Sequence, residues 1–157
     1  MTDIIIMDLD GVLCDNSHRA HLVPPADQQH RNEAWRPFVE QCVNDKPIAA
    51  GVALYESLIR KYPVIIVTSR QEIFSGKSRD WLECNVNVWG YPSPDVIFRS
   101  ATDHSTPAEY KRNTLKMLRG KGFNILFAVD DDPAIIDMYN AEGVATFQPS
   151  TRCSSCK

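Results

Sequence analysis

The sequence predicts an α/β fold built on a mostly parallel β-sheet. Short apolar runs that suit buried strands alternate along the chain with segments of helical periodicity. This alternation is typical of a parallel sheet covered by helices. The three most apolar runs also end in polar residues, which is typical of strands that deliver side chains to one edge of a sheet. The 157 residues are enough for one domain with its own hydrophobic core.

The first strand is predicted at residues 4–7, where the run IIIM continues without alternation into Asp8. Such a run is typical of a strand that is buried on both faces. Asp10 follows two residues later, and Gly11 allows a sharp turn. Residues two apart lie on the same side of an extended chain, so the two carboxylates are expected to converge. This pair is costly unless a cation or a shared proton compensates its charge.

Residues 14–46 form an unusually long connection between this strand and the next α/β unit. We interpret the segment as a small cap insert near the strand end. Its second half has apolar residues on one helical face, which predicts a helix that begins near Trp35 and has Pro37 in its first turn. The apolar residues of this face are Trp35, Phe38, Val39, Cys42 and Val43.

The middle of the chain repeats the alternation. A helix is predicted from about residue 50 to 61, with Leu54, Leu58 and Ile59 facing inward. A buried strand at residues 63–67 ends at Thr68 and Ser69. A polar loop at 71–77, a short helix around Trp81 and a weaker strand at 95–98 are expected to follow.

A capping box at residues 106–109 marks the start of the next helix, which carries Lys111 and stops near Gly120. Its core-facing residues are predicted to be Tyr110, Thr114, Met117 and Leu118.

A fourth strand at residues 124–129 leads directly into Asp130 and Asp131. Asp132 is predicted to cap a further helix that Pro133 opens and Gly143 closes. An edge strand at 144–147 is expected to complete the sheet.

Charge and composition limit the possible partners. A net charge of −3 gives no overall attraction to nucleic acid, so any contact with a polynucleotide has to be local. No apolar run approaches the length of a membrane span, and we expect a soluble cytoplasmic protein.

The last residues contain a single C-x-x-C pair, Cys153 and Cys156. Such a pair can be half of a zinc site or a redox pair, but no second pair at matching spacing accompanies it. We therefore expect residues 1–149 to form the domain and residues 150–157 to form a flexible tail without a metal role.

The three polar strand ends together favour phosphoryl transfer. A hard cation such as Mg²⁺ takes oxygen ligands, which Asp8 and Asp130 can supply. With the charge neutralised, an aspartate can attack a phosphate. Lys111 and the Thr68 hydroxyl are placed to hold the phosphoryl oxygens, and Asp10 to protonate the leaving oxygen.

These motifs in this order resemble the haloacid dehalogenase (HAD) superfamily of phosphatases, over about residues 3–148. The resemblance implies a three-layer Rossmann-like fold with strand order 3-2-1-4-5 and a small cap. It implies Asp8 as the nucleophile and Asp10 as the acid/base. It also implies a phosphate site and an Mg²⁺ site, with phosphate-binding residues Gly11, Thr68, Ser69 and Lys111 and metal ligands Asp8, Asp10, Asp130 and Asp131.

A narrower likeness rests on Arg19, which follows Asp10 by nine residues, on Arg70 directly after Thr68-Ser69, and on the V-D-D-D-P run at residues 129–133. The chain in these features resembles the 3′-phosphatase domain of phage-type polynucleotide kinases. This likeness implies that Arg19 and Arg70 serve substrate binding and catalysis. It also implies a nucleotide or a 3′-phosphorylated nucleic acid end as the substrate.

Two other interpretations stay open. The same site suits a phosphatase of 5′-(deoxy)nucleotides or of another small phosphorylated metabolite. A receiver-like signalling module also places Asp, Thr and Lys around Mg²⁺. In a receiver the phosphorylated Asp ends the third strand, whereas here the D-x-D pair ends the first, so the motif order disfavours this alternative.

Overall fold

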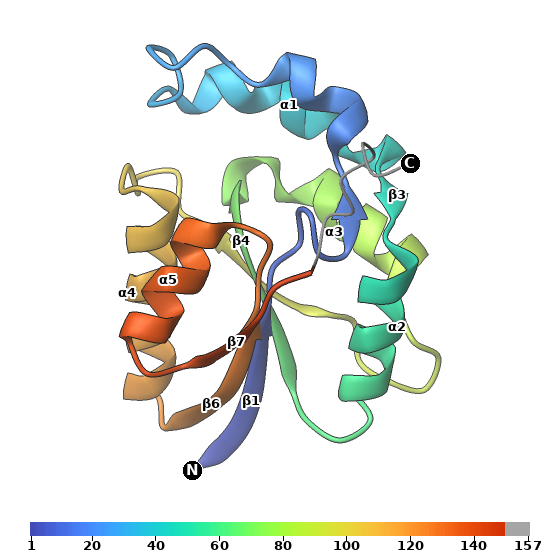
Figure 1. The fold of residues 1–157 in the computed structure, drawn as a ribbon. Helices are drawn as coiled ribbons and strands as arrows, with labels where there is room; N and C mark the ends of the chain where they lie inside the picture. Colours follow the sequence, from blue (N-terminus) through green and yellow to red (C-terminus); the bar gives the residue numbers. More distant parts are fainter. Residues whose placement is uncertain (150–157) are drawn as a thin grey trace, which may run out of the picture.

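The computed structural model describes residues 1–149, in which a five-stranded parallel sheet lies between two layers of helices (Figure 1). The sheet order is β5-β4-β1-β6-β7, so the predicted order 3-2-1-4-5 is confirmed and β1 is the central strand. Every neighbouring pair is parallel. The strands are β1 (Thr2–Met7), β4 (Val64–Gln71), β5 (Asp95–Arg99), β6 (Phe123–Val129) and β7 (Ala145–Phe147).

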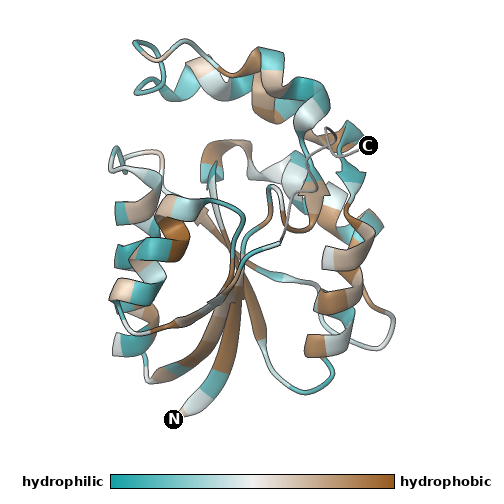
Figure 2. Cartoon of the chain, in the orientation of Figure 1, coloured by the Kyte–Doolittle hydropathy of each residue, from teal (hydrophilic) through white to brown (hydrophobic). Residues whose placement is uncertain are grey.

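The central strand separates two hydrophobic cores. Ile5 and Met7 belong to the core that contains side chains of α2 (Ala49–Leu58) and α3 (Ser75–Asn85). Ile4 and Ile6 belong to the core that contains side chains of α4 (Pro107–Gly120) and α5 (Pro133–Ala141). The middle parts of the strands are accordingly apolar, while polar residues gather at the strand ends and on the helices and loops (Figure 2). Burial on both faces explains why the first apolar run of the sequence shows no alternation.

Residues 14–47 form a helical insert between β1 and α2. Two short strands, β2 (Cys14–Asp15) and β3 (Lys46–Pro47), pair antiparallel at its base. The remainder of the insert lies beyond the carboxyl ends of the sheet strands (Figure 1). It contains α1 (Arg36–Glu40) and three 3₁₀ helices, η1 (Ser17–Leu22), η2 (Asn32–Trp35) and η3 (Gln41–Asn44).

The insert is helical where the apolar pattern predicted a helix. Pro37 lies in the first turn of α1, as expected. Phe38, Val39 and Cys42 are buried, whereas Val43 is exposed because the chain changes from α to 3₁₀ geometry after α1.

Two helices bury residues other than those that the sequence predicted. Leu54 is 39% exposed, and Tyr55 takes the core position on α2. Gly51 explains why α2 is rotated about its axis relative to the prediction. A Cβ at this position would lie 1.8 Å from the carbonyl oxygen of Val12, so the absence of a side chain lets α2 pack closely on the backbone there. On α4, Met117 is 38% exposed, and Leu115 is buried instead.

The segment expected as a polar loop at residues 71–77 is instead helical from Glu72 onward, after the last strand residue Gln71. The 3₁₀ helix η4 (Glu72–Phe74) follows β4 and leads directly into α3. The buried residues of α3 are Ser78, Trp81 and Leu82. Because none of them lies before residue 78, the polar first turns show no apolar periodicity that would predict a helix.

Both predicted helix starts at the site are confirmed. Thr106 and Glu109 form the reciprocal capping box of α4, and the Asp132 side chain accepts from the backbone N–H of Ala134 at the start of α5. No helix within residues 1–149 has both the length and the apolar character needed to cross a membrane. The predicted tail, with Cys153 and Cys156, lies outside the described residues.

Candidate active site

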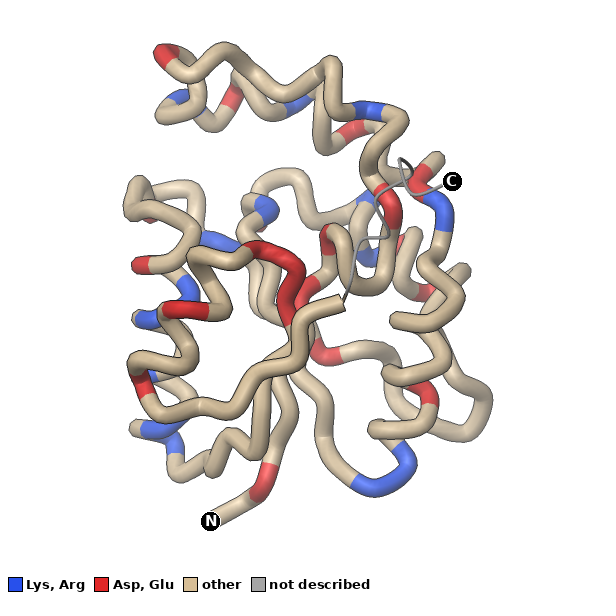
Figure 3. The backbone as a smooth tube through the Cα atoms, viewed as in Figure 1, with Lys and Arg blue, Asp and Glu red and all other residues tan. Residues whose placement is uncertain are grey.

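Three charged side chains meet at the carboxyl edge of the sheet. Asp8 directly follows β1, Asp130 directly follows β6, and Lys111 projects from the second turn of α4. The Lys111 ammonium nitrogen lies 2.9 Å from Asp8 Oδ1 and 2.6 Å from Asp130 Oδ2. All three residues are buried. Figure 3 shows the run of acidic residues after β6 beside the end of β1.

Asp131 completes an acidic cluster with Asp8 and Asp130. One carboxylate oxygen from each residue lies within 4.8 Å of the other two. Gly11 makes this approach possible, because its φ of +75° is in the left-handed region and a Cβ there would lie 2.0 Å from Asp131 Oδ2. A hard cation such as Mg²⁺ prefers oxygen ligands of this kind.

The protonation behaviour of the cluster also fits a cation. Burial raises the pKa of Asp8, and the charges of Asp130 and Asp10 add to this effect, so that the pKa reaches about 8 although Lys111 opposes it. Burial and Asp130 likewise raise the pKa of Asp131. Burial by itself would lower the pKa of Lys111, but Asp8 and Asp130 raise it well above its usual value. The carboxylates thus carry more negative charge than one lysine offsets.

Asp10 lies in a second network, which is formed by two arginines. Arg70 donates to both carboxylate oxygens of Asp10, from Nε to Oδ2 at 2.9 Å and from Nη2 to Oδ1 at 2.8 Å. Arg19 Nη2 donates to Asp10 Oδ1 at 3.1 Å. Both arginines also bind Asp45, which is buried directly after η3. The distances are 2.7 Å from Arg19 Nε and Nη2 and 2.9 Å from Arg70 Nη2.

This network fixes the charge of Asp10. Burial by itself would raise the pKa of Asp10, but Arg70, with Arg19 and Asn16, outweighs burial and lowers the pKa to about 2. Asp10 in turn raises the pKa of Arg70. The Asp10 carboxylate is therefore ionised at neutral pH and held in one orientation.

The two arginines lie behind Asp10 and are shielded from solvent. Arg19 is 0% exposed, its Nη1 donates to the backbone oxygen of Phe38 at 3.0 Å, and its guanidinium carbon lies 4.0 Å from the centre of the Phe38 ring. Arg70 Nη1 donates to Ser78 Oγ at 2.9 Å. The structure thus joins Arg19 and Arg70 to Asp10 and leaves their donors engaged within the protein.

Sequence reasoning missed Asp45. Its partners Arg19 and Arg70 are 26 and 25 residues away along the chain, and no local pattern marks it. An aspartate in an Asn-Asp-Lys-Pro sequence is typical of a turn. A usable signal was the count of charges, because two arginines and Asp10 leave one positive charge without a partner.

The remaining predicted residues lie at the end of β4. Thr68 is buried, and its Oγ1 accepts from the backbone N–H of Arg70 at 3.2 Å. Ser69 is partly exposed and lines two adjoining cavities, which also share Asp10 and Pro107.

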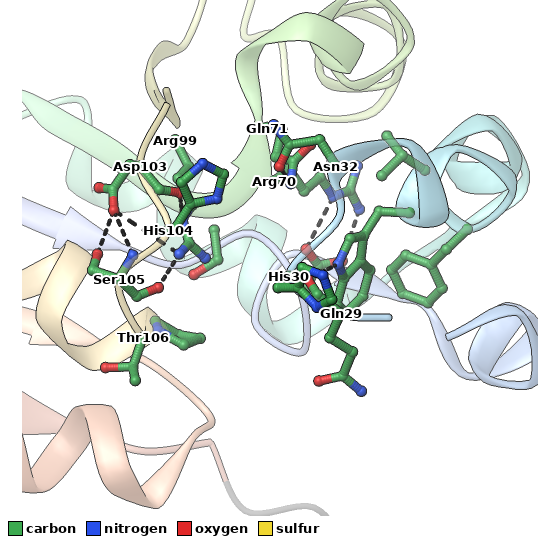
Figure 4. Close-up of a pocket in the computed structure, with 16 residues that line it drawn as sticks. Gln29, His30, Asn32, Arg70, Gln71, Arg99, Asp103, His104, Ser105 and Thr106 are labelled. Carbon is green, nitrogen blue, oxygen red and sulfur yellow. Dashed lines mark hydrogen bonds and ion pairs between the residues drawn. The ribbon is translucent and has the colours of Figure 1, made fainter. Parts of the chain in front are cut away.

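The two cavities differ in character. The acidic cavity, of about 410 Å³, is lined by the nucleophile candidate and its neighbours. These are Asp8, Asp10, Asn16, Ser69, Pro107, Lys111, Asp131, Asp132, Pro133 and Ile135. The insert cavity, of about 420 Å³, lies between the helical insert, the end of β4 and the loop at residues 99–107 (Figure 4).

A protein-family model described as the polynucleotide kinase PNKP phosphatase domain matches residues 2–151. A search of curated proteins returned no match.

Solved structures resemble this chain in fold. One, described as the structure of the Pnkp1/Rnl/Hen1 RNA repair complex, has a TM-score of 0.70 and 18% identity, covering 95% of this chain and 42% of that one. The chain therefore spans less than half the length of that relative. A haloacid dehalogenase-like hydrolase from Streptococcus pneumoniae has a TM-score of 0.63 and 15% identity, covering 94% of this chain and 84% of that one.

A third similar structure is a HAD family enzyme from Bacteroides thetaiotaomicron, described as a magnesium complex. Its TM-score is 0.54 and its identity 14%, covering 99% of this chain and 96% of that one. At these identities the likeness shows a shared fold. Because the family model spans almost the whole sequence, the chain belongs to the phosphatase domain family of polynucleotide kinase PNKP, within the haloacid dehalogenase superfamily.

Proposed function

We propose that this chain is an Mg²⁺-dependent phosphomonoesterase that acts through an aspartyl-phosphate on nucleotide or polynucleotide 3′-phosphates. The position of Asp8 carries the proposal. This carboxylate is buried at the end of the central strand, 2.9 Å from Lys111, and lies in the acidic cavity beside Asp130 and Asp131.

In the first step an Asp8 carboxylate oxygen attacks phosphorus, and the bond from phosphorus to the leaving oxygen breaks. Lys111 holds phosphoryl oxygens through its ammonium group, and the Thr68 hydroxyl and the backbone near Gly11 and Ser69 add donors. Lys111 also favours the ionised form of Asp8 that the attack requires. Mg²⁺, held by Asp8, Asp130 and Asp131 together with the backbone carbonyl of Asp10, would neutralise carboxylate and phosphate charge.

Asp10 moves the protons. In the first step a substrate bound as the monoanion supplies one proton, which Asp10 passes to the leaving oxygen. In the second step Asp10 accepts a proton from the water that attacks the aspartyl-phosphate, the bond from phosphorus to Asp8 breaks, and phosphate is released. Asp10 then loses this proton to solvent, which restores the starting state of both aspartates. Because its pKa is lowered, the Asp10 carboxylate is already ionised and can accept this proton without first losing one.

Arg19 and Arg70 act in this scheme by positioning Asp10. Their nitrogens are engaged by Asp10 and Asp45 and are buried, so they set the direction from which Asp10 meets the leaving oxygen. The family and the likeness to an RNA repair protein support a nucleic acid 3′ end as substrate. The insert residues would then serve as the cap over the site.

Trapping the phosphorylated enzyme tests the proposal. Wild-type protein mixed with Mg²⁺ and a ³²P-labelled nucleoside 3′-phosphate, then quenched in acid, should carry label on Asp8, as located by peptide mass spectrometry. Asp8→Asn should carry no label, and the matched exposed substitution Asp137→Asn should behave as wild type. Turnover without any labelled enzyme, or label on another residue, would contradict the mechanism.

A further inference from the structure

We infer that the insert cavity holds the nucleoside next to the reacting phosphate and that Trp35 recognises its base by stacking. The inference rests on the proposed function, because it takes the phosphate at Asp8 as its starting point. Beyond that function, the inference states that the helical insert contacts the nucleoside and that stacking is the main contact.

The position of the insert cavity makes it the place for the leaving group. The two cavities meet at Asp10, Ser69 and Pro107, whereas Asp8 and Lys111 line only the acidic cavity. Asp10 delivers the proton to the leaving oxygen in the proposed mechanism, so the leaving group has to extend past Asp10. A volume of about 420 Å³ is within the range of small-molecule sites and suits one nucleoside better than several nucleotides.

The walls of this cavity are rich in flat side chains. His30, Trp35 and Phe38 come from the insert, and His104 comes from the loop on the opposite side. In Figure 4, His30 and His104 face each other across the space. Bases stack on aromatic rings with little regard to their identity, because every base has a π face.

Trp35 is held as a stacking surface. Its Nε1 donates to the backbone oxygen of Gln29 at 2.9 Å, so the only polar atom of the indole is already paired. Its ring packs edge to face against Phe38, with the ring centres 5.7 Å apart and the planes at 81°. With its N–H paired and its ring packed against Phe38, the indole is held in a fixed orientation and offers apolar surface to the cavity.

The polar groups of the wall indicate an uncharged ligand portion. Arg99 donates to the backbone oxygens of Asp103 and Ser105. Asn32 and Gln71 bind each other, with Gln71 Nε2 donating to Asn32 Oδ1 at 2.6 Å. With Nε and Nη2 of Arg99 and the amides of Asn32 and Gln71 engaged within the protein, the cavity suits a neutral planar group such as a base.

The test compares two substrates that differ only in the base. These are thymidine 3′-phosphate and the 3-phosphate of 1,2-dideoxyribose, each assayed with Mg²⁺. Wild type should prefer the thymidine compound by about 10- to 100-fold in kcat/KM, because stacking one base contributes about 1–3 kcal/mol. Trp35→Ala should lose most of this preference through a higher KM for the thymidine compound, with a much smaller effect on the baseless compound, and Trp35→Phe should keep most of the preference.

Trp89→Ala is the matched control, because Trp89 is 97% exposed on the loop between α3 and β5 and does not line the cavity. Equal wild-type turnover of the two substrates would overturn the inference, and this comparison holds even if Trp35→Ala does not fold. An equal loss on both substrates in Trp35→Ala would also overturn it and assign Trp35 a structural role. If neither substrate releases phosphate, the proposed function fails, and this inference fails with it.

Discussion

Asp8 and Asp10 lie two residues apart and have opposite electrostatic surroundings. Asp8 is buried with other carboxylates, which raises its pKa, whereas Asp10 is enclosed by two guanidinium groups, which lower its pKa. Neighbouring carboxyl groups whose pKa values are pushed apart can take different roles in one reaction. Burial and charged partners thus give the two carboxyl groups the different protonation behaviour that the proposed roles of nucleophile and acid/base require.

Asp8→Asn should abolish phosphatase activity and alter the pH dependence of stability. In the metal-free protein, folding raises the pKa of Asp8 from 3.8 to about 8. Between these values the folded state holds a proton that the unfolded state has released, so the free energy of unfolding falls as pH rises. Asparagine removes this loss. In EDTA, the Tm of the variant minus that of wild type should therefore increase from pH 5 to pH 8, measured by thermal melts.

A Tm difference that shrinks over this range would contradict the raised pKa of Asp8. Retention of more than a few per cent of wild-type turnover would contradict its role as the nucleophile.

Asp45→Asn should weaken both catalysis and folding, because it leaves the buried guanidinium groups of Arg19 and Arg70 to share the single carboxylate of Asp10. Breaking a buried ion pair costs about 3–5 kcal/mol, which corresponds to a fall in Tm on the order of 10 °C. Loss of one charged hydrogen bond that aligns the site should lower kcat/KM by about 10- to 100-fold. Steady-state assays well below the Tm, together with melts, measure both effects.

Glu33→Gln is the control for this prediction, since Glu33 forms an exposed ion pair with Arg36 in the same insert. It should change the Tm and kcat/KM little. Wild-type activity in Asp45→Asn would show that the arginines need no second partner to hold Asp10.

At the scale of elements, the helical insert is fastened to the core by a chain of hydrogen bonds. Asn32 Nδ2 donates to the backbone oxygen of Ala101 at 2.6 Å, and Asn32 Oδ1 accepts from Gln71. The Ala101 oxygen can only accept, so it fixes the orientation of both amides. Gln71 Oε1 is then left buried without a partner within residues 1–149. The contact between the insert and β4 is therefore less stable than one in which every polar atom is paired.

Asn32→Ala should therefore loosen the insert without affecting the acidic cavity. We expect faster cleavage of the insert by a protease under native conditions and a higher KM, with kcat changed less than KM. Asn44→Ala is the control, because Asn44 is exposed and binds only within η3. An unchanged cleavage rate and KM in Asn32→Ala would show that this chain of hydrogen bonds does not hold the insert.

The sequence predicted the strands well because a central strand buried on both faces has a distinctive apolar run, whereas their order followed from the resemblance to the HAD superfamily. Helix starts with a local cap, such as Thr106 and Asp132, were equally accessible. The sequence did not predict which face of α2 is buried or that Asp45 binds the two arginines. The orientation of α2 depends on contact between Gly51 and the backbone of Val12, and Asp45 depends on partners about 25 residues away. Contacts between distant segments leave no periodic signal.

For the whole molecule, the net charge of −3 limits the attraction of a polyanion. If one nucleoside occupies the insert cavity, extending the substrate from a mononucleotide to a longer 3′-phosphorylated strand should change kcat/KM by less than about 10-fold. The dependence on salt should be correspondingly weak. A steep rise of kcat/KM with strand length, lost at high salt, would indicate an extended nucleic acid surface instead.

The central claim, hydrolysis of nucleic acid 3′-phosphates, is tested most directly with two isomers of one short single-stranded oligonucleotide, phosphorylated at either the 3′ or the 5′ end. Phosphate release is followed with Mg²⁺ and, as a control, with excess EDTA. We predict rapid Mg²⁺-dependent release from the 3′ isomer, much slower release from the 5′ isomer, and none from either in EDTA. Efficient release from the 5′ isomer, with the 3′ isomer left intact, would contradict the account.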